Sequence, residues 1–255
     1  MITDIDIGTT GYYYTTLSRT EKSVYNRTLS SWINERRVRI VITEKTQSGA
    51  LIGKEALLRI VKCVLLDHPC IFNLNSLQIE VTYLNDGLLL IVPSLYSEEE
   101  FVSAAEKLHE RVRDIAAFAE QMPFHRDKAD YLIGLLSENM IYDTVTAKVS
   151  CRRMAHEAVG PLLNGAGTCA GAAKAFALLC DACGIENRIV TGFLQVDGVQ
   201  KRHMWNLILP DGMRQYVDIM IAVCGGDGVT GTDCYFFEEA SRQRGYITDQ
   251  IKKEI

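Results

Sequence analysis

The spacing of apolar residues predicts a helix that begins at residue 169. Between Ala173 and Cys180 the apolar residues recur at helical spacing. Gly184 follows the last of these periodic residues, where a left-handed helix cap is expected. Cys169 therefore stands at the predicted helix N-terminus, where unpaired backbone N–H groups and the helix dipole favour a thiolate and can hold an oxyanion. Gly171 and the alanines after it leave room for other backbone to approach the first turn.

Further along the chain, the spacing of apolar residues changes from helical to the alternation that is typical of the two strands of a β-hairpin. Residues 203–209 and 214–219 alternate between apolar and polar, and Asp211-Gly212 between them is typical of a two-residue turn. This turn sets a register in which His203 and Asp218 lie on the same sheet face, one diagonal step apart. A slip of one residue would send Asp218 to the opposite face. A strand over residues 187–194 is expected before this hairpin.

These three side chains have the chemistry of a nucleophilic triad. Cys169 would attack an amide carbonyl, His203 would take and later return a proton, and Asp218 would orient the imidazole. Each residue alone is more often structural, because a single cysteine on an apolar helix is usually a small buried hydrophobe. Together, with a helix N-terminus and a consistent register, they predict a catalytic site.

The motifs resemble those of a known superfamily. Residues 167–176 resemble the nucleophile motif G-x-C-x-G-x-A-x-A-F of the transglutaminase-like superfamily. Residues 184–192 resemble its "GI…R-V-V-T-G" strand, residues 203–206 its H-A-W-N motif, and residues 217–218 its final V-D. The resemblance implies an α+β fold with a papain-like core, in which the catalytic helix packs on an antiparallel sheet. It assigns the nucleophile, base and orienting acid to Cys169, His203 and Asp218.

The resemblance extends over nearly the whole chain, with two departures. Residues 12–25, 67–69, 130–132 and 142–143 are similar to landmarks of bacterial members. Bacterial relatives commonly have an aromatic residue where Ala172 stands, and often a histidine where Ala129 stands. Both departures concern the wall of the substrate cleft rather than the triad.

Candidate substrate-binding residues lie next to these motifs. They are Trp205, Gly167 and Asn164; Asn164 is a candidate oxyanion donor, although its Asn-Gly context favours a turn. Residues 145–165 are expected to form a loop at the rim of the site. His156 within it is interpreted as an exposed loop residue.

The chain divides into a smaller N-terminal α/β region, 1–97, and a catalytic domain, 98–255. The N-terminal region is expected to contain helices over 21–37 and 53–67 and strands over 39–43, 78–83 and 88–92. The catalytic domain is expected to add helices over 98–121, 128–140 and 236–244. Ser97 and Glu100 have the spacing of a capping box at the start of the first of these.

Composition and net charge argue against some classes of binding partner. The 255 residues include 27 basic and 32 acidic side chains, and the net charge of −5 argues against nucleic acid or an anionic membrane as a partner. No apolar run reaches the ~20 residues of a membrane span, and the N-terminus lacks the pattern of a signal peptide. Eight cysteines in a chain of this length suit reduced thiols and a cytoplasmic location; the alternative is an exported protein whose signal segment has been removed.

No cofactor is predicted. Cys180 and Cys183 could supply half a zinc site with Cys224 and Cys234, but the second pair has the wrong spacing and structural thiols are favoured. Residues 225–231 lack the lysine and the strand–helix context of a phosphate loop. The absence of a D-x-D-x-D-G pattern predicts independence from calcium.

The expected function is acyl transfer through a Cys169 thioester on a protein or peptide substrate, acting as a transglutaminase, a deamidase or a cysteine protease. The triad chemistry is common to all three activities. The alternative is a catalytically silent domain of the same fold that binds peptides or proteins.

Overall fold

The computed structural model describes residues 11–144, 153–196, 198–225, 229, 231–237, 241 and 244–249. The chain forms two compact units that divide between Val102 and Ser103, and each is considered by itself. The expected boundary after residue 97 remains a prediction. Residues 145–152 of the expected rim loop, most of residues 225–231 and part of the helix expected over 236–244 lie outside the described residues.

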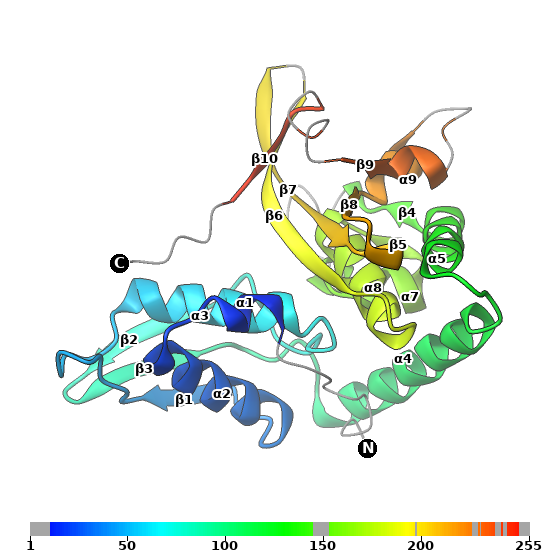
Figure 1. Ribbon diagram of the computed structural model, residues 1–255. Helices are drawn as coiled ribbons and strands as arrows, with labels where there is room; N and C mark the ends of the chain where they lie inside the picture. The colour runs from blue at the N-terminus through cyan, green and yellow to red at the C-terminus, as the bar shows by residue number, and fades with distance from the viewer. Residues whose placement is uncertain are drawn as a thin grey trace. The chain divides into compact units, whose positions relative to one another are not determined.

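The first unit contains three helices and a three-stranded antiparallel sheet of order β1-β3-β2 within its described residues (Figure 1). The elements are α1 (Tyr12–Thr15), α2 (Arg19–Ile33), β1 (Arg39–Ile42), α3 (Lys54–Asp67), β2 (Glu80–Leu84) and β3 (Gly87–Ile91). Ile40 and Ile42 of β1 and Leu88 and Leu90 of β3 are buried on one face, as a sheet with one covered face requires. The two long helices and three strands of this region are confirmed, whereas the four-residue helix α1 was not anticipated.

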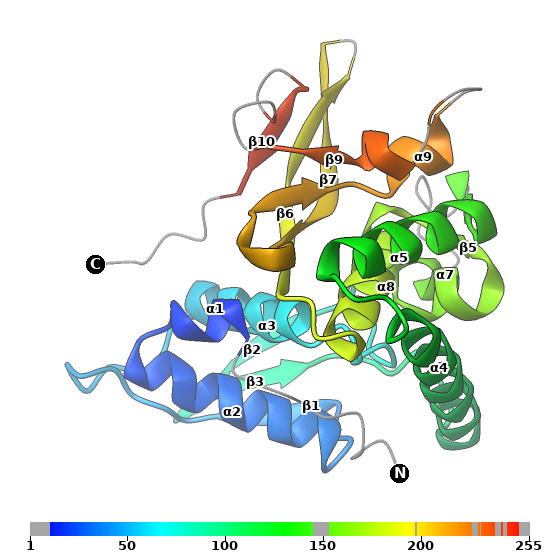
Figure 2. The ribbon, with the colours of Figure 1, turned by 45° about the vertical axis from the view of Figure 1, so that its right-hand side comes forward.

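The second unit contains a five-stranded antiparallel sheet of order β10-β6-β7-β8-β9 within its described residues (Figure 2). Its strands are β6 (Asn187–Val196), β7 (Val199–Ile208), β8 (Gln215–Val217), β9 (Tyr235–Phe236) and β10 (Tyr246–Thr248). Helix α8 (Cys169–Ala182) packs against β6 and β7, and α5 (His125–Asn139) packs against α8. A helix on an antiparallel sheet is the arrangement expected from the sequence, so the α+β class is confirmed.

Helix α4 (Glu98–Ala119) begins as the sequence predicts. Ser97 Oγ accepts a hydrogen bond from the Glu100 backbone N–H, and the Glu100 carboxylate accepts one from the Ser97 N–H at 2.8 Å. Both halves of the capping box are therefore present.

The predicted hairpin register is also confirmed. Asp211 and Gly212 have φ values of 50° and 82°, which suit a two-residue hairpin turn, and the Met213 N–H donates to the Pro210 carbonyl at 3.0 Å. Ile208 then pairs with Gln215, as a turn centred on Asp211-Gly212 requires.

Three expectations are wrong in part. Residues 153–164 are not a loop but form the 3-10 helix η2 (Arg153–His156) and α7 (Val159–Asn164). Pro161 lies in the first turn of α7, where backbone N–H groups need no helical partner, so it does not end the helix.

The returning strand of the hairpin is shorter than expected. It ends at Val217 and is followed by α9 (Met220–Cys224), because the Asp218 carboxylate accepts a hydrogen bond from the Met220 N–H at 3.0 Å and turns the chain. At the other end of the sheet, Phe236 belongs to β9 rather than to a closing helix. The short strands β9 and β10 were not predicted, since two or three residues are too few to show alternation.

Candidate active site

Cys169 is the first residue of α8, as its sequence position indicates. Thr168 before it is extended, with φ −94° and ψ 178°, and its carbonyl accepts the first helical hydrogen bond, from the Ala172 N–H at 2.9 Å. The Cys169 side chain is partly exposed and free. The thiol thus stands at a helix N-terminus, where free N–H groups and the dipole favour negative charge.

The first turn of α8 is held closely by the backbone of η2. The Thr168 N–H donates to the Ala155 carbonyl at 2.9 Å, and that same carbonyl lies where a Cβ on Gly171 would be. This contact explains the glycine two residues after the nucleophile, because a side chain would push the helix away from η2.

We expect Gly171→Ala to destabilise the protein by about 1–3 kcal/mol, the typical cost of overpacking a close contact. Denaturant unfolding of the variant would measure this. Gly134→Ala is the matched control, since Gly134 also lies in a helix and a Cβ added there would meet nothing within 4 Å. Equal stability of the two variants would contradict the argument.

His203 and Asp218 form a buried pair. The His203 Nε2 atom lies 2.6 Å from Asp218 Oδ2, and the two side chains are 11% and 3% exposed. Asp218 Oδ1 accepts the Met220 N–H that begins α9. The sheet register therefore brings together the two residues that the hairpin was expected to bring together.

Two hydrogen bonds act on the His203 ring. Burial by itself lowers the pKa of His203, but hydrogen bonds to Asp218 and Cys169 outweigh it and raise this pKa to about 10. Because Nε2 faces Asp218, Nδ1 is the ring atom left for Cys169. The imidazole thus links the thiol of α8 to the carboxylate after β8, and both contacts favour its charged form.

The residues after His203 fasten β7 to its neighbours. The Trp205 ring stacks near that of His203, with centroids 6.0 Å apart, and is only 1% exposed. Asn206 Nδ2 donates to the Ala173 carbonyl of α8 at 3.0 Å. Trp205 was expected to contact substrate, but its burial argues for a supporting role beneath His203.

A tyrosine that sequence reasoning missed also reaches Asp218. Tyr246 Oη donates to Asp218 Oδ2 at 2.6 Å, from the edge strand β10. No sequence signal pointed to it, because β10 is three residues long and lies beyond the motifs.

Behind the first turn of α8 lies a buried ion pair. Lys174 Nζ and Glu157 Oε2 are 2.5 Å apart, with side chains 6% and 2% exposed. Next to Glu157, His156 Nδ1 lies 3.0 Å from Thr168 Oγ1. His156 is partly buried, not an exposed loop residue as expected, and burial, followed by the charge of Lys174, lowers its pKa. Both contacts join the segment before the nucleophile to α8.

The turn before Cys169 is held by a short parallel bridge. Strand β4 (Ile141–Tyr142) pairs with β5 (Ala166–Gly167), so that Tyr142 lies opposite Gly167. The Asp143 N–H donates to the Gly167 carbonyl at 3.0 Å. A Cβ on Gly167 would lie 2.7 Å from Pro161 Cγ, so this glycine is required for packing. Asn164 is the last residue of α7, and the left-handed Gly165 (φ 63°) caps this helix, so the expected Asn-Gly turn is a helix C-terminus.

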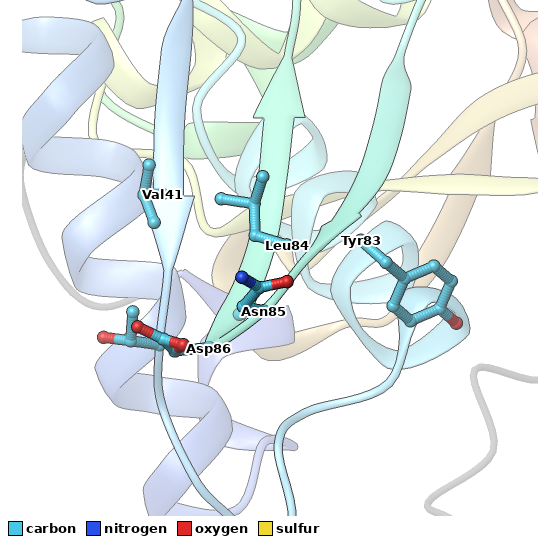
Figure 3. A pocket seen from close by; sticks show the side chains of 7 residues that line it. Val41, Tyr83, Leu84, Asn85 and Asp86 are labelled. Atoms are coloured by element: carbon cyan, nitrogen blue, oxygen red, sulfur yellow. The ribbon is translucent and has the colours of Figure 1, made fainter.

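The described residues contain no group of three or more histidine, cysteine or acidic side chains that could hold a metal. Cys180, Cys183 and Cys234 are buried free thiols. In the part of the chain that the structure describes, no helix has the length and apolar character needed to cross a membrane. A hollow of about 430 Å³ lies in the first unit and is lined by residues 41, 43 and 83–87, including the exposed Tyr83 (Figure 3). None of its lining residues belongs to the candidate site.

Comparisons with known proteins agree with the motifs. The family model described as the transglutaminase-like superfamily matches residues 110–217, which include Cys169 and His203 and end one residue before Asp218. No curated protein matches the chain.

Solved structures give weaker similarities. A TGase structure is 12% identical with a TM-score of 0.40, over 80% of this chain and 55% of that one. A candidate cysteine protease from Cytophaga hutchinsonii is 11% identical with a TM-score of 0.34, over 68% and 70% of the two chains. A candidate protease from Parabacteroides distasonis is 13% identical with a TM-score of 0.32, over 55% and 35%. This chain thus spans about half the length of the TGase chain.

Proposed function

Residues 110–217 of this chain belong to the transglutaminase-like superfamily, and on that premise we propose that the protein is a cysteine-dependent acyl-transfer enzyme acting on amide bonds. The observation that carries the proposal is the contact of His203 with both Asp218 and Cys169 at the N-terminus of α8. A histidine between a carboxylate and a thiol is the arrangement that activates a sulfur nucleophile.

In the proposed resting state, the thiol proton already resides on His203. The raised pKa of His203 keeps the imidazolium protonated through the neutral range, and Asp218 balances its charge. An imidazolium beside a cysteine at a helix N-terminus is the environment that favours a thiolate in activated cysteine enzymes.

The thiolate attacks the carbonyl carbon of a glutamine side chain or a peptide bond. Charge that develops on the carbonyl oxygen is stabilised by backbone N–H groups at the start of α8. His203 gives its proton to the departing nitrogen, the carbon–nitrogen bond breaks, and a Cys169 thioester remains.

A second nucleophile completes the reaction. His203, now neutral, accepts the proton of the incoming water or amine, which attacks the thioester carbon and restores the thiolate. Water gives deamidation or proteolysis, and a primary amine gives transglutamination. We propose a protein or peptide as the substrate, no metal or other cofactor, independence from calcium, and a cytoplasmic location in keeping with the buried free thiols of Cys180 and Cys234.

The proposal is tested by offering one substrate to all three activities. Casein with methylated lysines is incubated with the protein and a biotinylated primary amine, in the presence of a calcium chelator. Biotin incorporation reports transglutamination, conversion of glutamine to glutamate reports deamidation, and the appearance of new chain ends reports proteolysis. Any of the three supports acyl transfer without calcium, whereas activity that appears only when calcium is added would overturn calcium independence.

The thiolate itself is tested without a substrate. Iodoacetamide should alkylate wild-type Cys169 rapidly near pH 6.5, where an ordinary thiol with a pKa near ~8.5 is about 1% ionised. His203→Ala should slow this reaction about 10- to 100-fold. Since the pKa of His203 is raised to about 10, the imidazolium that protonates the departing nitrogen is present below that pH and is lost as the pH rises through it, so acyl transfer should decline above about pH 10.

Peptide mass mapping reads the alkylation at each cysteine separately. His109→Ala, on the exposed face of α4, is the control variant, and Cys70 in the first unit is the reference thiol. Slow alkylation of Cys169 that does not depend on His203 would instead favour a catalytically silent binding domain.

A further inference from the structure

We infer that Tyr246 is a positioning residue of the proposed active site, whose hydroxyl fixes the Asp218 carboxylate against His203. The inference rests on the proposed function, because it concerns a group that acts through the triad. Tyr246 lies 29 residues beyond the end of the matched family region at residue 217, since 246 − 217 = 29, so neither the motifs nor the family match assigns it.

The geometry of Asp218 supports this role. Its Oδ2 atom receives two donors, His203 Nε2 and Tyr246 Oη, each at 2.6 Å, while Oδ1 receives the Met220 N–H at 3.0 Å. The residue is 2% exposed, so these contacts replace water around the carboxylate. Hydrogen bonds to charged groups are the stronger ones, and a buried carboxylate needs several.

Tyr246 remains a donor over the working range. Burial, and then the negative charge of Asp218, raises the pKa of Tyr246 well above its usual value, so the phenol keeps its proton. Its ring packs against Trp205 and Phe236, with centroids 5.0 and 4.6 Å away. These contacts fix the orientation of the Tyr246 ring and therefore the position of its hydroxyl.

Strand β10, which carries Tyr246, is held by contacts just before its first residue and just after its last. The Gln195 N–H donates to the Gly245 carbonyl at 2.9 Å, just before Tyr246. Just after the strand, the Asp249 carboxylate binds the Arg202 guanidinium through two contacts of 2.9 and 3.0 Å. Asp249 also accepts from Thr191 Oγ1 at 2.9 Å, so β10 is fastened to both β6 and β7.

A glycine lets the strand lie this close. The Ile247 carbonyl occupies the place that a Cβ on Gly192 would take. Gly192 pairs with His203 on β7 and with Thr248 on β10, so β7 and β10 flank it on its two sides. β10 therefore packs closely against Gly192, the residue that pairs with His203. This close packing brings Tyr246 to Asp218.

Without the hydroxyl, Asp218 Oδ2 would keep His203 as its donor but lose the second restraint. The carboxylate would then turn more freely, and the imidazolium would spend less time aligned with Cys169. Loss of one hydrogen bond to a charged group corresponds to about a tenfold effect. We expect Tyr246→Phe to slow iodoacetamide alkylation of Cys169 about tenfold near pH 6.5, and to shift the pH profile part of the way toward that of His203→Ala.

Tyr25→Phe is the matched control. Tyr25 is also a buried tyrosine whose hydroxyl donates to a carboxylate, that of Asp67 at 3.0 Å, but it belongs to the first unit. Its alkylation profile should coincide with that of the wild type. Replacement of Tyr246 by 3-fluorotyrosine keeps the ring and restores a donor, so it should recover the wild-type rate. Thermal melts of every variant separate loss of folding from loss of alignment.

A second measurement covers the case in which Tyr246→Phe does not fold. In the 3-fluorotyrosine protein, the stronger donor on Asp218 Oδ2 should shift the proton resonance of His203 Nε2–H relative to the wild type. An unchanged resonance would overturn the inference.

The outcomes separate the two proposals. A tenfold slower Tyr246→Phe with a wild-type Tyr25→Phe supports the inference. A Tyr246→Phe profile that matches the wild type, while His203→Ala is slow, overturns the inference and leaves the proposed function standing. A wild-type Cys169 that reacts as an ordinary thiol and ignores His203→Ala overturns both.

Discussion

Replacing Cys169 with alanine is expected to abolish acyl transfer while leaving the fold intact. The proposed chemistry passes through a bond to this sulfur, so its loss should lower kcat by about a thousandfold or more, as removal of a nucleophile from a triad does. The cost in stability should be less than about 1 kcal/mol, because Cys169 is partly exposed and removing its thiol creates no enclosed cavity.

The measurement is the casein assay with its three readouts, run beside a denaturant unfolding curve. Cys224→Ala is the control, since Cys224 is an exposed cysteine at the end of α9 in the same unit. It should retain full activity. Turnover that survives in Cys169→Ala would remove the nucleophile assignment, whichever of the three products is formed.

The largest loss of stability is expected from breaking the buried ion pair. The Lys174 side chain is only 6% exposed, and Glu157→Ala removes the carboxylate that pairs with its ammonium group. Removing one member of a buried pair typically costs about 3–5 kcal/mol, because the remaining charge stays uncompensated. We therefore expect a loss of that size in the free energy of unfolding of the second unit.

Two controls make this expectation sharp. Asp114→Ala breaks the exposed pair with Arg113, whose charged atoms are 2.9 Å apart, and should cost less than about 1 kcal/mol. The double variant Glu157→Leu with Lys174→Met replaces both charges and should recover most of the loss. A Glu157→Ala protein as stable as Asp114→Ala would show that water or another group compensates Lys174.

The sequence was most informative where local chemistry determines geometry. Helix α8 was predicted from its start at Cys169 to its left-handed Gly184, because apolar spacing and a glycine cap are local signals. The pairing of Ile208 with Gln215 followed from the preference of Asp-Gly for positive φ, so the relation of His203 to Asp218 could be worked out from a turn.

What the sequence did not reveal depends on contacts between distant segments. Glu157 and Lys174 are ordinary surface residue types, and only the packing of η2 on α8 makes them a buried pair. Tyr246 lies 28 positions from Asp218, and its short strand has no periodic pattern. The helices over residues 153–164 were missed because Gly160-Pro161 signals a turn unless it falls in the first turn of a helix.

The bridge between β4 and β5 affects how such a protein can diversify. The position of the turn before Cys169 depends on main-chain atoms, from the Ile141 N–H on Gly165 and the Asp143 N–H on Gly167. The side chains of β4 therefore do not position this turn. Tyr142, which lies opposite Gly167 and is 38% exposed, can be exchanged without moving the nucleophile. A directed library can therefore vary Tyr142 while the backbone hydrogen bonds that position the turn before Cys169 are kept.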